Sequence, residues 1–370
     1  MKVVLDAYWW VSGPASLRHV QREIVFAWSQ LFPDDELTLV MRRKHLAAAT
    51  DIPASVVIRA TALWPQGLAA TRAAAEAAAD ADLVLTHNFA ASTRLAPGAL
   101  SAVYLHDVLF ATNPEWFTLA ERLYFSYMLR WVRRAQLVFT SSASEAARIA
   151  GNSRARAVVP VGLGLSTELT ANADDTEADV SLTPGAFVLT VGRLNARKNL
   201  AMTIDAALAS GRISPELPLL VVGAPNGRRG PLGAAIAEGV ASGAIRFSGH
   251  VSDRRLRWYY RNASLVVYLS LGEGFGMPPV EAAYFSAPTL VSDLPVFRET
   301  LGSLASYVDP TDLQAAAAAI ARGIAIGDAS PPPRGVRGSV ANQHDWHQTV
   351  RAMRAAVDQR ITAQAVTATP

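Results

Sequence analysis

Cysteine is absent from the 370 residues of the chain, so it can form no disulfide framework and no thiolate zinc site, and it has no cysteine nucleophile. Charge is also scarce, because only 18% of the residues are charged and 34 Lys and Arg against 31 Asp and Glu leave a formal net charge of +3. The sequence has no clustered basic stripe and no run of about 18 apolar residues. These absences argue against a nucleic-acid partner and against a membrane-spanning helix.

The first six residues lack the pattern of an export signal, because Asp6 stands where the apolar region of a signal peptide would lie. We therefore expect a cytoplasmic protein. The positive mean hydropathy of +0.18 leaves open whether the protein touches the inner face of the cell membrane.

What the chain does have is length and apolar sequence. Its 370 residues exceed the about 250–300 residues at which a single core stops growing, and a hydrophobic fraction of 51% suffices for two cores. Short apolar runs alternate with segments of helical periodicity, which is typical of parallel sheets buried on both faces. We expect strands near residues 3–7, 37–41, 56–58, 83–86, 102–105, 137–140, 187–191, 217–222, 245–248, 265–269 and 289–292. We expect helices near residues 16–31, 67–79, 115–134, 144–150, 199–210, 233–241, 253–260, 279–285 and 312–321.

A polar, aperiodic stretch interrupts this alternation, and we interpret residues 168–184 as a linker. The predicted fold is α/β, with two doubly wound, Rossmann-like domains over residues 1–167 and 185–343 and a last helix over residues 344–358. In such folds ligands bind beyond the carboxyl ends of the strands. The cleft between the two domains is therefore the expected site.

The loop after the first strand of the second domain carries two cations, Arg193 and Lys198, and then opens a helix. A guanidinium, an ammonium and a helix N-terminus together suit a diphosphate. The alternative is a solvated basic turn, but the position at the carboxyl end of a strand favours a site.

A second loop, Gly-Glu-Gly-Phe-Gly-Met-Pro-Pro-Val-Glu over residues 272–281, precedes another predicted helix. Its glycines leave backbone N–H groups free to point at a ligand, and we expect Pro279 to begin the helix. We place Glu273 in the loop and Glu281 in the first helical turn. Both suit the recognition of sugar hydroxyls, because an ionised carboxylate accepts hydrogen bonds from hydroxyl groups. For Glu281 alone, ordinary charge placement at a helix N-terminus is the alternative.

In the first domain, the turn at Gly13 allows backbone to approach a phosphate, although a plain strand-to-helix turn would also carry a glycine there. Trp9 and Trp10 end the first strand and are candidates for stacking on an acceptor sugar, the alternative being core packing. The triplet Asp80-Ala81-Asp82 lies between a helix and a strand, so we interpret it as structural, and we expect no metal site.

These motifs resemble one known family. Gly-Arg-Leu-x-x-x-Lys-Asn over residues 192–199 and Glu-Gly-Phe-Gly-Met-Pro-Pro-Val-Glu-Ala over residues 273–282 are similar to the retaining glycosyltransferases of family 4, which have the two-domain GT-B fold. Residues 248–253 and 287–292 resemble the segments around the second motif. Asp345-Trp346 resembles the start of the family's last helix, which crosses back to the first domain. Tyr-Leu-His-Asp over residues 104–107 resembles the family's His-Asp at a strand end.

The resemblance implies that Arg193 and Lys198 bind the donor diphosphate. It implies that Glu273 holds hydroxyls of the donor sugar and Glu281 holds the ribose. The glycine-rich loop would contact sugar or phosphate through its backbone, at Gly274, Phe275, Gly276 and Met277. The base would lie near Gly249, His250 and Val251.

For the first domain the resemblance implies that Gly13 packs near the diphosphate and that His106 contacts the donor sugar. We take His106 as the candidate nearest the reacting carbon, a capping or core histidine being the alternative, and Asp107 as an acceptor contact. The catalytic set is then His106, Glu273, Arg193 and Lys198. Because these cations and a helix N-terminus can stabilise the leaving diphosphate, we expect a metal-independent reaction without a cofactor.

The predicted function is transfer of a hexose from a nucleoside-diphosphate sugar to a glycan or lipid-linked glycan. A likeness to bacterial mannosyltransferases of polysaccharide assembly favours GDP-mannose, while UDP-glucose, UDP-N-acetylhexosamine and dTDP-rhamnose stay open. The alternatives are a non-catalytic protein that binds sugar nucleotides or glycans and a GT-B sugar-nucleotide epimerase.

Residues 116–134 form an aromatic and basic segment. Such a helix can lie on an anionic membrane, and it can equally pack its aromatic side chains on the sheet. Both interpretations stay open at this point.

Overall fold

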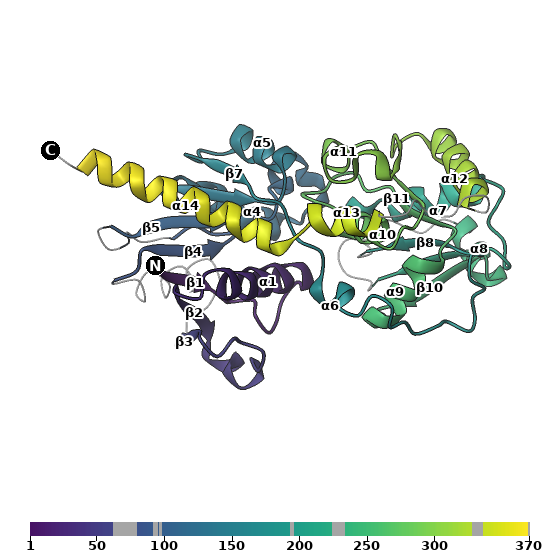
Figure 1. Cartoon of the computed structure of the whole chain (residues 1–370). Helices are drawn as coiled ribbons and strands as arrows, with labels where there is room; N and C mark the ends of the chain where they lie inside the picture. The colour runs from purple at the N-terminus through teal and green to yellow at the C-terminus, as the bar shows by residue number, and fades with distance from the viewer. Residues whose placement is uncertain are drawn as a thin grey trace. The chain divides into compact units, whose positions relative to one another are not determined.

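The computed structural model describes residues 1–61, 80–91, 95, 98–192, 196–223, 234–327 and 336–368. The chain divides into two compact units, which are described separately: unit 1 is Met1–Gly164 with His344–Pro370, and unit 2 is Leu165–Gln343 (Figure 1). Each unit is built on a parallel sheet, which confirms the predicted α/β fold with two Rossmann-like domains. The helix predicted over residues 67–79 lies outside the described residues.

Unit 1 contains a seven-stranded sheet in the order β3-β2-β1-β4-β5-β6-β7. Its strands are β1 (Lys2–Asp6), β2 (Glu36–Arg42), β3 (Val57–Thr61), β4 (Leu83–His87), β5 (Leu100–Tyr104), β6 (Leu137–Thr140) and β7 (Val158–Pro160). Every residue of the central strands β4, β5 and β6 is buried, as expected for apolar runs covered on both faces. The strand order reverses between β1 and β4, where doubly wound sheets bind ligands.

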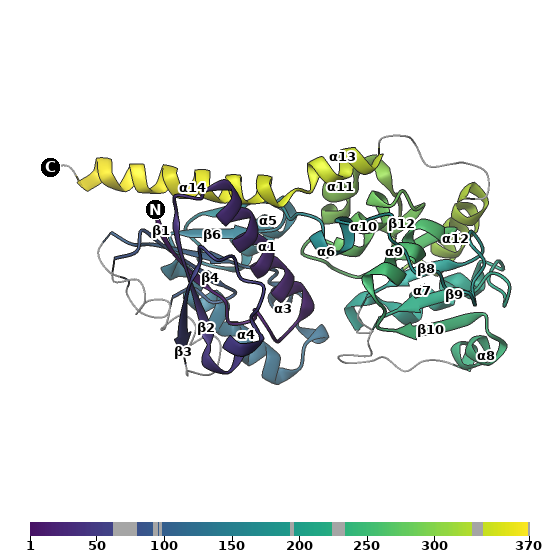
Figure 2. The same cartoon turned by 60° about the horizontal axis from the view of Figure 1, so that its bottom comes forward.

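The helices of unit 1 include the last helix of the chain. They are α1 (Ala15–Leu31), α3 (Leu109–Thr112), α4 (Leu119–Trp131), α5 (Ala143–Asn152) and α14 (Trp346–Ala368), with 3₁₀ turns η1 (Arg43–Ala48), η2 (Pro114–Trp116) and η3 (Val132–Arg134). Helix α14 lies against α1 (Figures 1 and 2). Trp346 packs so tightly on Gly164 that a Cβ there would come within 2.3 Å of the ring. The last helix therefore returns to the first domain, as the family resemblance implies.

Unit 2 contains a six-stranded sheet in the order β10-β9-β8-β11-β12-β13. Its strands are β8 (Val188–Val191), β9 (Leu219–Val222), β10 (Ile245–Gly249), β11 (Leu265–Tyr268), β12 (Thr289–Ser292) and β13 (Ser306–Val308). Its helices and 3₁₀ turns are α6 (Thr167–Thr170), η4 (Ala196–Lys198), α7 (Leu200–Ala209), α8 (Ala234–Ser242), α9 (Asp253–Asn262), α10 (Met277–Tyr284), α11 (Pro295–Leu301), η5 (Gly302–Leu304), α12 (Leu313–Gly327) and α13 (Val336–Gln343).

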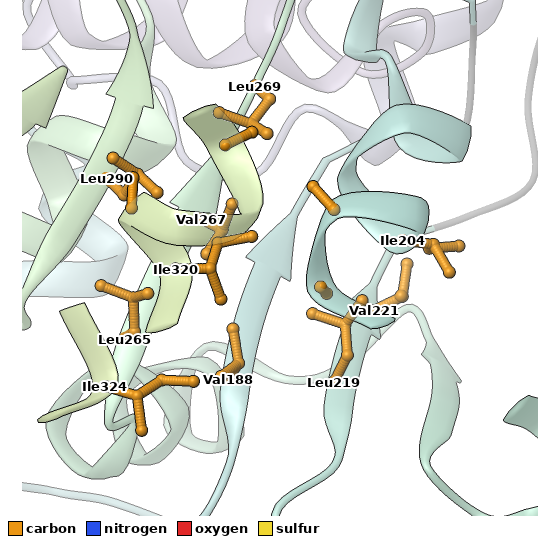
Figure 3. Packing of buried hydrophobic residues seen from close by; sticks show 14 of the residues in the cluster. Val188, Ile204, Leu219, Val221, Leu265, Val267, Leu269, Leu290, Ile320 and Ile324 are labelled. Carbon is orange, nitrogen blue, oxygen red and sulfur yellow. The ribbon is translucent and has the colours of Figure 1, made fainter. Parts of the chain in front are cut away.

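The core of unit 2 joins the sheet to α7 and α12. Val188, Leu265 and Val267 of the strands meet Ile320 and Ile324 of α12 (Figure 3). All five side chains are at most 2% exposed. Burying one such side chain contributes about 1.5–3 kcal/mol, so this core fixes the strand ends from which the candidate site is built.

The segment predicted as a linker is ordered within unit 2. The guanidinium of the buried Arg257 donates to the carbonyl oxygens of Glu168, Leu169 and Asp175 at 2.6, 2.9 and 2.8 Å. Arg261 adds an ion pair with Asp174 at 2.6 Å. Helix α9 therefore holds this polar segment through backbone carbonyls, which aperiodic polar sequence does not reveal.

Candidate active site

The carboxyl ends of β8 and β11 present two loops at the same edge of the unit 2 sheet. The two strands pair in parallel, so the loops that follow them start side by side. The N–H of Leu271 donates to the carbonyl of Arg197 at 2.9 Å, which joins the loops. The sequence motifs over residues 192–199 and 272–281 thus come together in space. Lys198 and Glu273 are in contact although they are 75 residues apart in the sequence.

A buried ion pair lies at the centre of this junction. Nζ of Lys198 is 2.6 Å from Oε1 of Glu273, and a guanidinium nitrogen of Arg197 is 3.3 Å from Oε2. Tyr268, the last residue of β11, donates its hydroxyl to Oε1 of Glu273 at 3.1 Å and also contacts Lys198. The side chains of Glu273 and Lys198 are only 7% and 16% exposed, so their charges act in a poorly hydrated setting.

The charges around Glu273 keep it ionised. Burial alone would raise the pKa of this carboxyl, but the positive charges of Lys198 and Arg197 lower it below the usual value. The same burial, together with the charge of Glu273, raises the pKa of Tyr268 well above its ordinary value. The site therefore holds a neutral phenol, one carboxylate and two cations, with the cations suited to a diphosphate and the carboxylate to hydroxyl groups.

The glycine-rich turn before α10 is closely packed. Gly276 caps the helix with φ at +90°, and a Cβ there would lie 2.3 Å from the ring of Phe297. Phe275 is 8% exposed, so its ring is packed rather than displayed. The helix begins at Met277, not at Pro279 as predicted, because Met277 already has helical geometry after the left-handed Gly276. The backbone of Gly274, Phe275, Gly276 and Met277 follows Glu273 at the carboxyl edge of the unit 2 sheet.

Glu281 is placed deeper than predicted. Since α10 begins at Met277, Glu281 lies in the second turn and not in the first. It is 9% exposed, and the hydroxyl of Tyr260 donates to it at 2.9 Å. Burial raises the pKa of this carboxyl to about 7, although the bond from Tyr260 opposes the shift. Ordinary charge placement at a helix N-terminus does not explain such a group.

The predicted role of Glu281 gives a pH dependence. If its carboxylate accepts ribose hydroxyls, binding favours the ionised form, so nucleoside diphosphate should bind about tenfold more tightly at pH 8 than at pH 6. Titration calorimetry at both values measures the change. Glu281→Gln should bind more weakly at pH 8 and lose most of the dependence, leaving only that of the phosphate. An unaltered dependence in the variant would contradict the role.

The residues predicted to contact the base lie at the end of β10. Gly249 has φ at +68°, and its carbonyl accepts a hydrogen bond from the N–H of Gly223, which follows β9, at 2.9 Å. His250 is exposed and Val251 is half-buried. These residues occupy the same carboxyl edge as the ion pair, which keeps them available as a base contact.

In unit 1 the turn after β1 packs against itself. Gly13 has φ at +112°, and a Cβ there would come within 2.1 Å of the ring of Trp9. Trp10 is 1% exposed and donates its indole N–H to Asp51 at 3.1 Å. The acceptor contact predicted for Trp10 is therefore wrong, since its ring belongs to the core. Trp9 is half-buried and stays a candidate.

His106 lies in a cluster of rings at the ends of β4 and β5. Its ring centroid is 5.0 Å from that of Tyr104 and 6.1 Å from that of His87, with which it stacks. Burial, and secondarily the nearby His87, lowers the pKa of His106 well below its ordinary value, while burial lowers that of His87 to about 3. Both imidazoles are thus neutral at physiological pH.

The loop that carries His106 and Asp107 is held from α5. The fully buried Glu145 accepts the N–H of Val108 at 2.8 Å and also pairs with Arg148. Burial foremost, and then the charge of Asp107, raises the pKa of Glu145 to about 8. Glu145 therefore fixes the backbone immediately after the candidate acceptor contact.

Neutrality of His106 is directly testable. The ¹⁵N shifts of its ring should show no protonation between about pH 8 and about pH 5 in the labelled full-length protein, because charging a buried imidazole is unfavourable. The His106→Gln variant assigns the resonances. A titration midpoint above about pH 5 would contradict the interpretation.

Several residues of the site were not predicted from the sequence, and one predicted residue has no described position. Arg193 lies outside the described residues. Arg197, between Ala196 and Lys198, is the second cation at Glu273, and only its position beside Lys198 could have indicated it. Tyr268, Tyr260 and Glu145 sit in apolar or helical patterns that carry no sign of a site.

Two further properties concern the described part of the chain alone. None of its helices is both long enough and apolar enough to cross a membrane. No cluster of three or more His, Asp or Glu side chains suited to a metal ion occurs among the same residues, and Asp80 instead pairs with Lys2 at 2.6 Å.

Comparison with known proteins shows which family unit 2 matches and which fold the chain has. Residues 175–328 match the family described as glycosyl transferases group 1, so unit 2 contains a domain of this type. Sucrose-phosphate synthase from Thermosynechococcus elongatus superposes with a TM-score of 0.71 at 19% identity, over 98% of this chain and 100% of that one. Anabaena Alr3699/HepE in complex with UDP and glucose superposes with a TM-score of 0.65 at 17% identity, over 97% of this chain and 100% of that one. The fold is therefore GT-B.

Shorter stretches of the sequence match particular curated proteins. The O-antigen chain mannosyltransferase RfbU of Salmonella typhimurium is 46% identical over 68 residues, which are 18% of this chain and 19% of that one. The matches to this and the other most similar curated relatives span at most 36% of their lengths. They agree with the family 4 resemblance of the sequence motifs.

Proposed function

We propose that the protein is a retaining glycosyltransferase that moves a hexose from a nucleoside-diphosphate sugar to a glycan or lipid-linked glycan. The observation that carries the proposal is the buried pair of Lys198 and Glu273, which joins the two loops at the carboxyl edge of the group 1 domain. One partner suits the leaving diphosphate and the other suits the hydroxyls of the sugar.

In this proposal different residues of unit 2 bind different parts of the donor. Lys198, with Arg193, binds the diphosphate, and the arriving phosphates compete with Glu273 for the ammonium group. Glu273 then accepts from sugar hydroxyls, and Glu281 accepts from the ribose. The backbone of Gly274 to Met277 contacts sugar or phosphate, and residues 249–251 receive the base.

The reaction needs one bond broken and one formed. The bond between the anomeric carbon and the β-phosphate oxygen breaks, and its electron pair stays on that oxygen. An acceptor hydroxyl oxygen bonds to the anomeric carbon on the same face, and its proton passes to the departing phosphate. The cations stabilise the negative charge that develops, so no metal is required. In this proposal His106 contacts the donor sugar, as the family resemblance implies, and its neutral imidazole does not oppose the positive charge that develops on the reacting carbon.

For the donor we propose GDP-mannose. The support is the match to an O-antigen chain mannosyltransferase. A uridine nucleotide is the competing donor, because one protein of the same fold was solved with UDP and glucose. We place the reaction in the cytoplasm, and Trp9 and Asp107 stay candidates for the acceptor.

A donor panel tests the proposal. The protein is incubated with GDP-mannose, UDP-glucose, UDP-N-acetylglucosamine or dTDP-rhamnose, with and without bacterial lipid-linked glycans, and nucleoside diphosphate release is measured. We expect acceptor-dependent release with GDP-mannose that persists in excess chelator. Loss of activity in chelator, restored by a divalent cation, would remove the metal-free account. Tight nucleotide binding without release from any donor would favour a non-catalytic binding protein, and conversion of the sugar on its nucleotide would favour an epimerase.

A further inference from the structure

Helix α4 presents large apolar side chains to solvent. Leu119, Leu123 and Tyr127 are 78%, 65% and 44% exposed. Their spacing of four residues aligns them along one side of the helix. Scattered exposed apolar residues are ordinary, but an aligned set on one helix indicates a contact surface.

The opposite side of α4 accounts for the core packing. Met128 is buried, and Tyr124, Phe125, Leu129 and Trp131 pack against the same apolar cluster. The aromatic residues noted in the sequence therefore divide between the two sides. Core packing explains the inner side only, and the outer stripe remains without a role.

The charges beside this stripe are mostly positive. Between residues 109 and 136 the basic residues are Arg122, Arg130, Arg133 and Arg134, and all four are exposed. Of the two acidic residues there, Glu121 is turned toward the helix start, where its carboxylate accepts the N–H of Thr118 at 2.8 Å. The segment carries two of the three net positive charges of the chain. An apolar stripe flanked by arginines complements an anionic lipid surface.

We propose that the α4 face, defined as Leu119, Leu123 and Tyr127 with Arg122, Arg130, Arg133 and Arg134, binds anionic membranes. The apolar stripe enters the boundary between headgroups and acyl chains, and the arginines contact lipid phosphates. This binding requires neither donor nor acceptor, so it is independent of the proposed transferase activity.

Vesicle flotation of the full-length protein tests the proposal. Vesicles of phosphatidylcholine alone are compared with vesicles that also contain phosphatidylglycerol, without any nucleotide. We expect binding to the anionic vesicles that weakens as salt rises. The double variant Arg130→Gln/Arg133→Gln should bind about 30-fold more weakly, and Leu119→Gln/Leu123→Gln at least about tenfold more weakly.

Matched controls separate the α4 face from general surface effects. Val180 is apolar and 99% exposed in unit 2, so Val180→Gln should leave vesicle binding unchanged. Unaltered circular dichroism and an unaltered midpoint of thermal unfolding would show that the α4 variants fold. The proposal is overturned if the protein does not float with anionic vesicles, or if the α4 variants bind them like the parent. Concentration-dependent dimers that dissociate in the leucine variant, without vesicle binding, would instead identify a second copy as the occupant.

Discussion

Replacing Glu273 with glutamine is expected to remove transfer while leaving nucleoside diphosphate binding intact. The neutral amide accepts weaker hydrogen bonds from sugar hydroxyls, so turnover should fall at least about 100-fold. The diphosphate, in contrast, gains from the change, because Lys198 no longer has a carboxylate 2.6 Å away. We therefore expect affinity for nucleoside diphosphate to stay within about threefold of the parent or to improve.

Three measurements and one control make this result specific. Titration calorimetry gives the affinity, and release of nucleoside diphosphate gives the turnover. Loss of the charged hydrogen bonds should also cost about 1.5–3 kcal/mol of stability, visible as a lower midpoint of thermal unfolding. Glu238 is exposed on α8, so Glu238→Gln should change nothing. Equal loss of binding and turnover in Glu273→Gln would show that Glu273 is misassigned.

Replacing Lys198 with methionine is expected to do the opposite and act mainly on binding. A charge-assisted bond to phosphate contributes about 1.5–3 kcal/mol, so affinity for nucleoside diphosphate should fall about 10- to 100-fold. Methionine keeps much of the length of the side chain against Tyr268, whose ring lies 4.8 Å from Nζ. The pKa of Glu273 should rise, because its nearest cation is gone while its burial stays.

Lysine is rare in this chain, which provides a matched control. Only Lys2, Lys44 and Lys198 occur in the sequence. Lys44 is exposed in η1, so Lys44→Met should bind nucleotide like the parent. An affinity of Lys198→Met equal to that of Lys44→Met would contradict the assigned role.

The sequence predicts the central strands well but misses two short strands at sheet edges. Apolar runs such as β4 and β6 are unmistakable because they are buried on both faces. The missed strands, β7 and β13, have three residues each and lie at the sheet edges, where little periodicity is left to detect. The predicted helix over residues 115–134 begins later, at Leu119, because Thr118 and Glu121 form a capping box.

For the candidate site, the motifs indicated which loops meet but not how their side chains pair. Glycines and charges at strand ends pointed to Lys198 and Glu273, which do lie together. The pairing with Arg197 depends on the turn η4, and the bond from Tyr260 to Glu281 depends on how α9 packs beside α10. Trp10 shows the same limit, since only the fold separates a buried ring from a displayed one.

The most direct test of the account is the stoichiometry of transfer with GDP-mannose. The protein is given the donor and a lipid-linked glycan acceptor, and GDP and the acceptor product are quantified in the same reaction. The account predicts one GDP for each acceptor that gains one hexose, with the anomeric configuration retained, and almost no product from Glu273→Gln. GDP release with no glycosylated acceptor, or full product formation by Glu273→Gln, would contradict it.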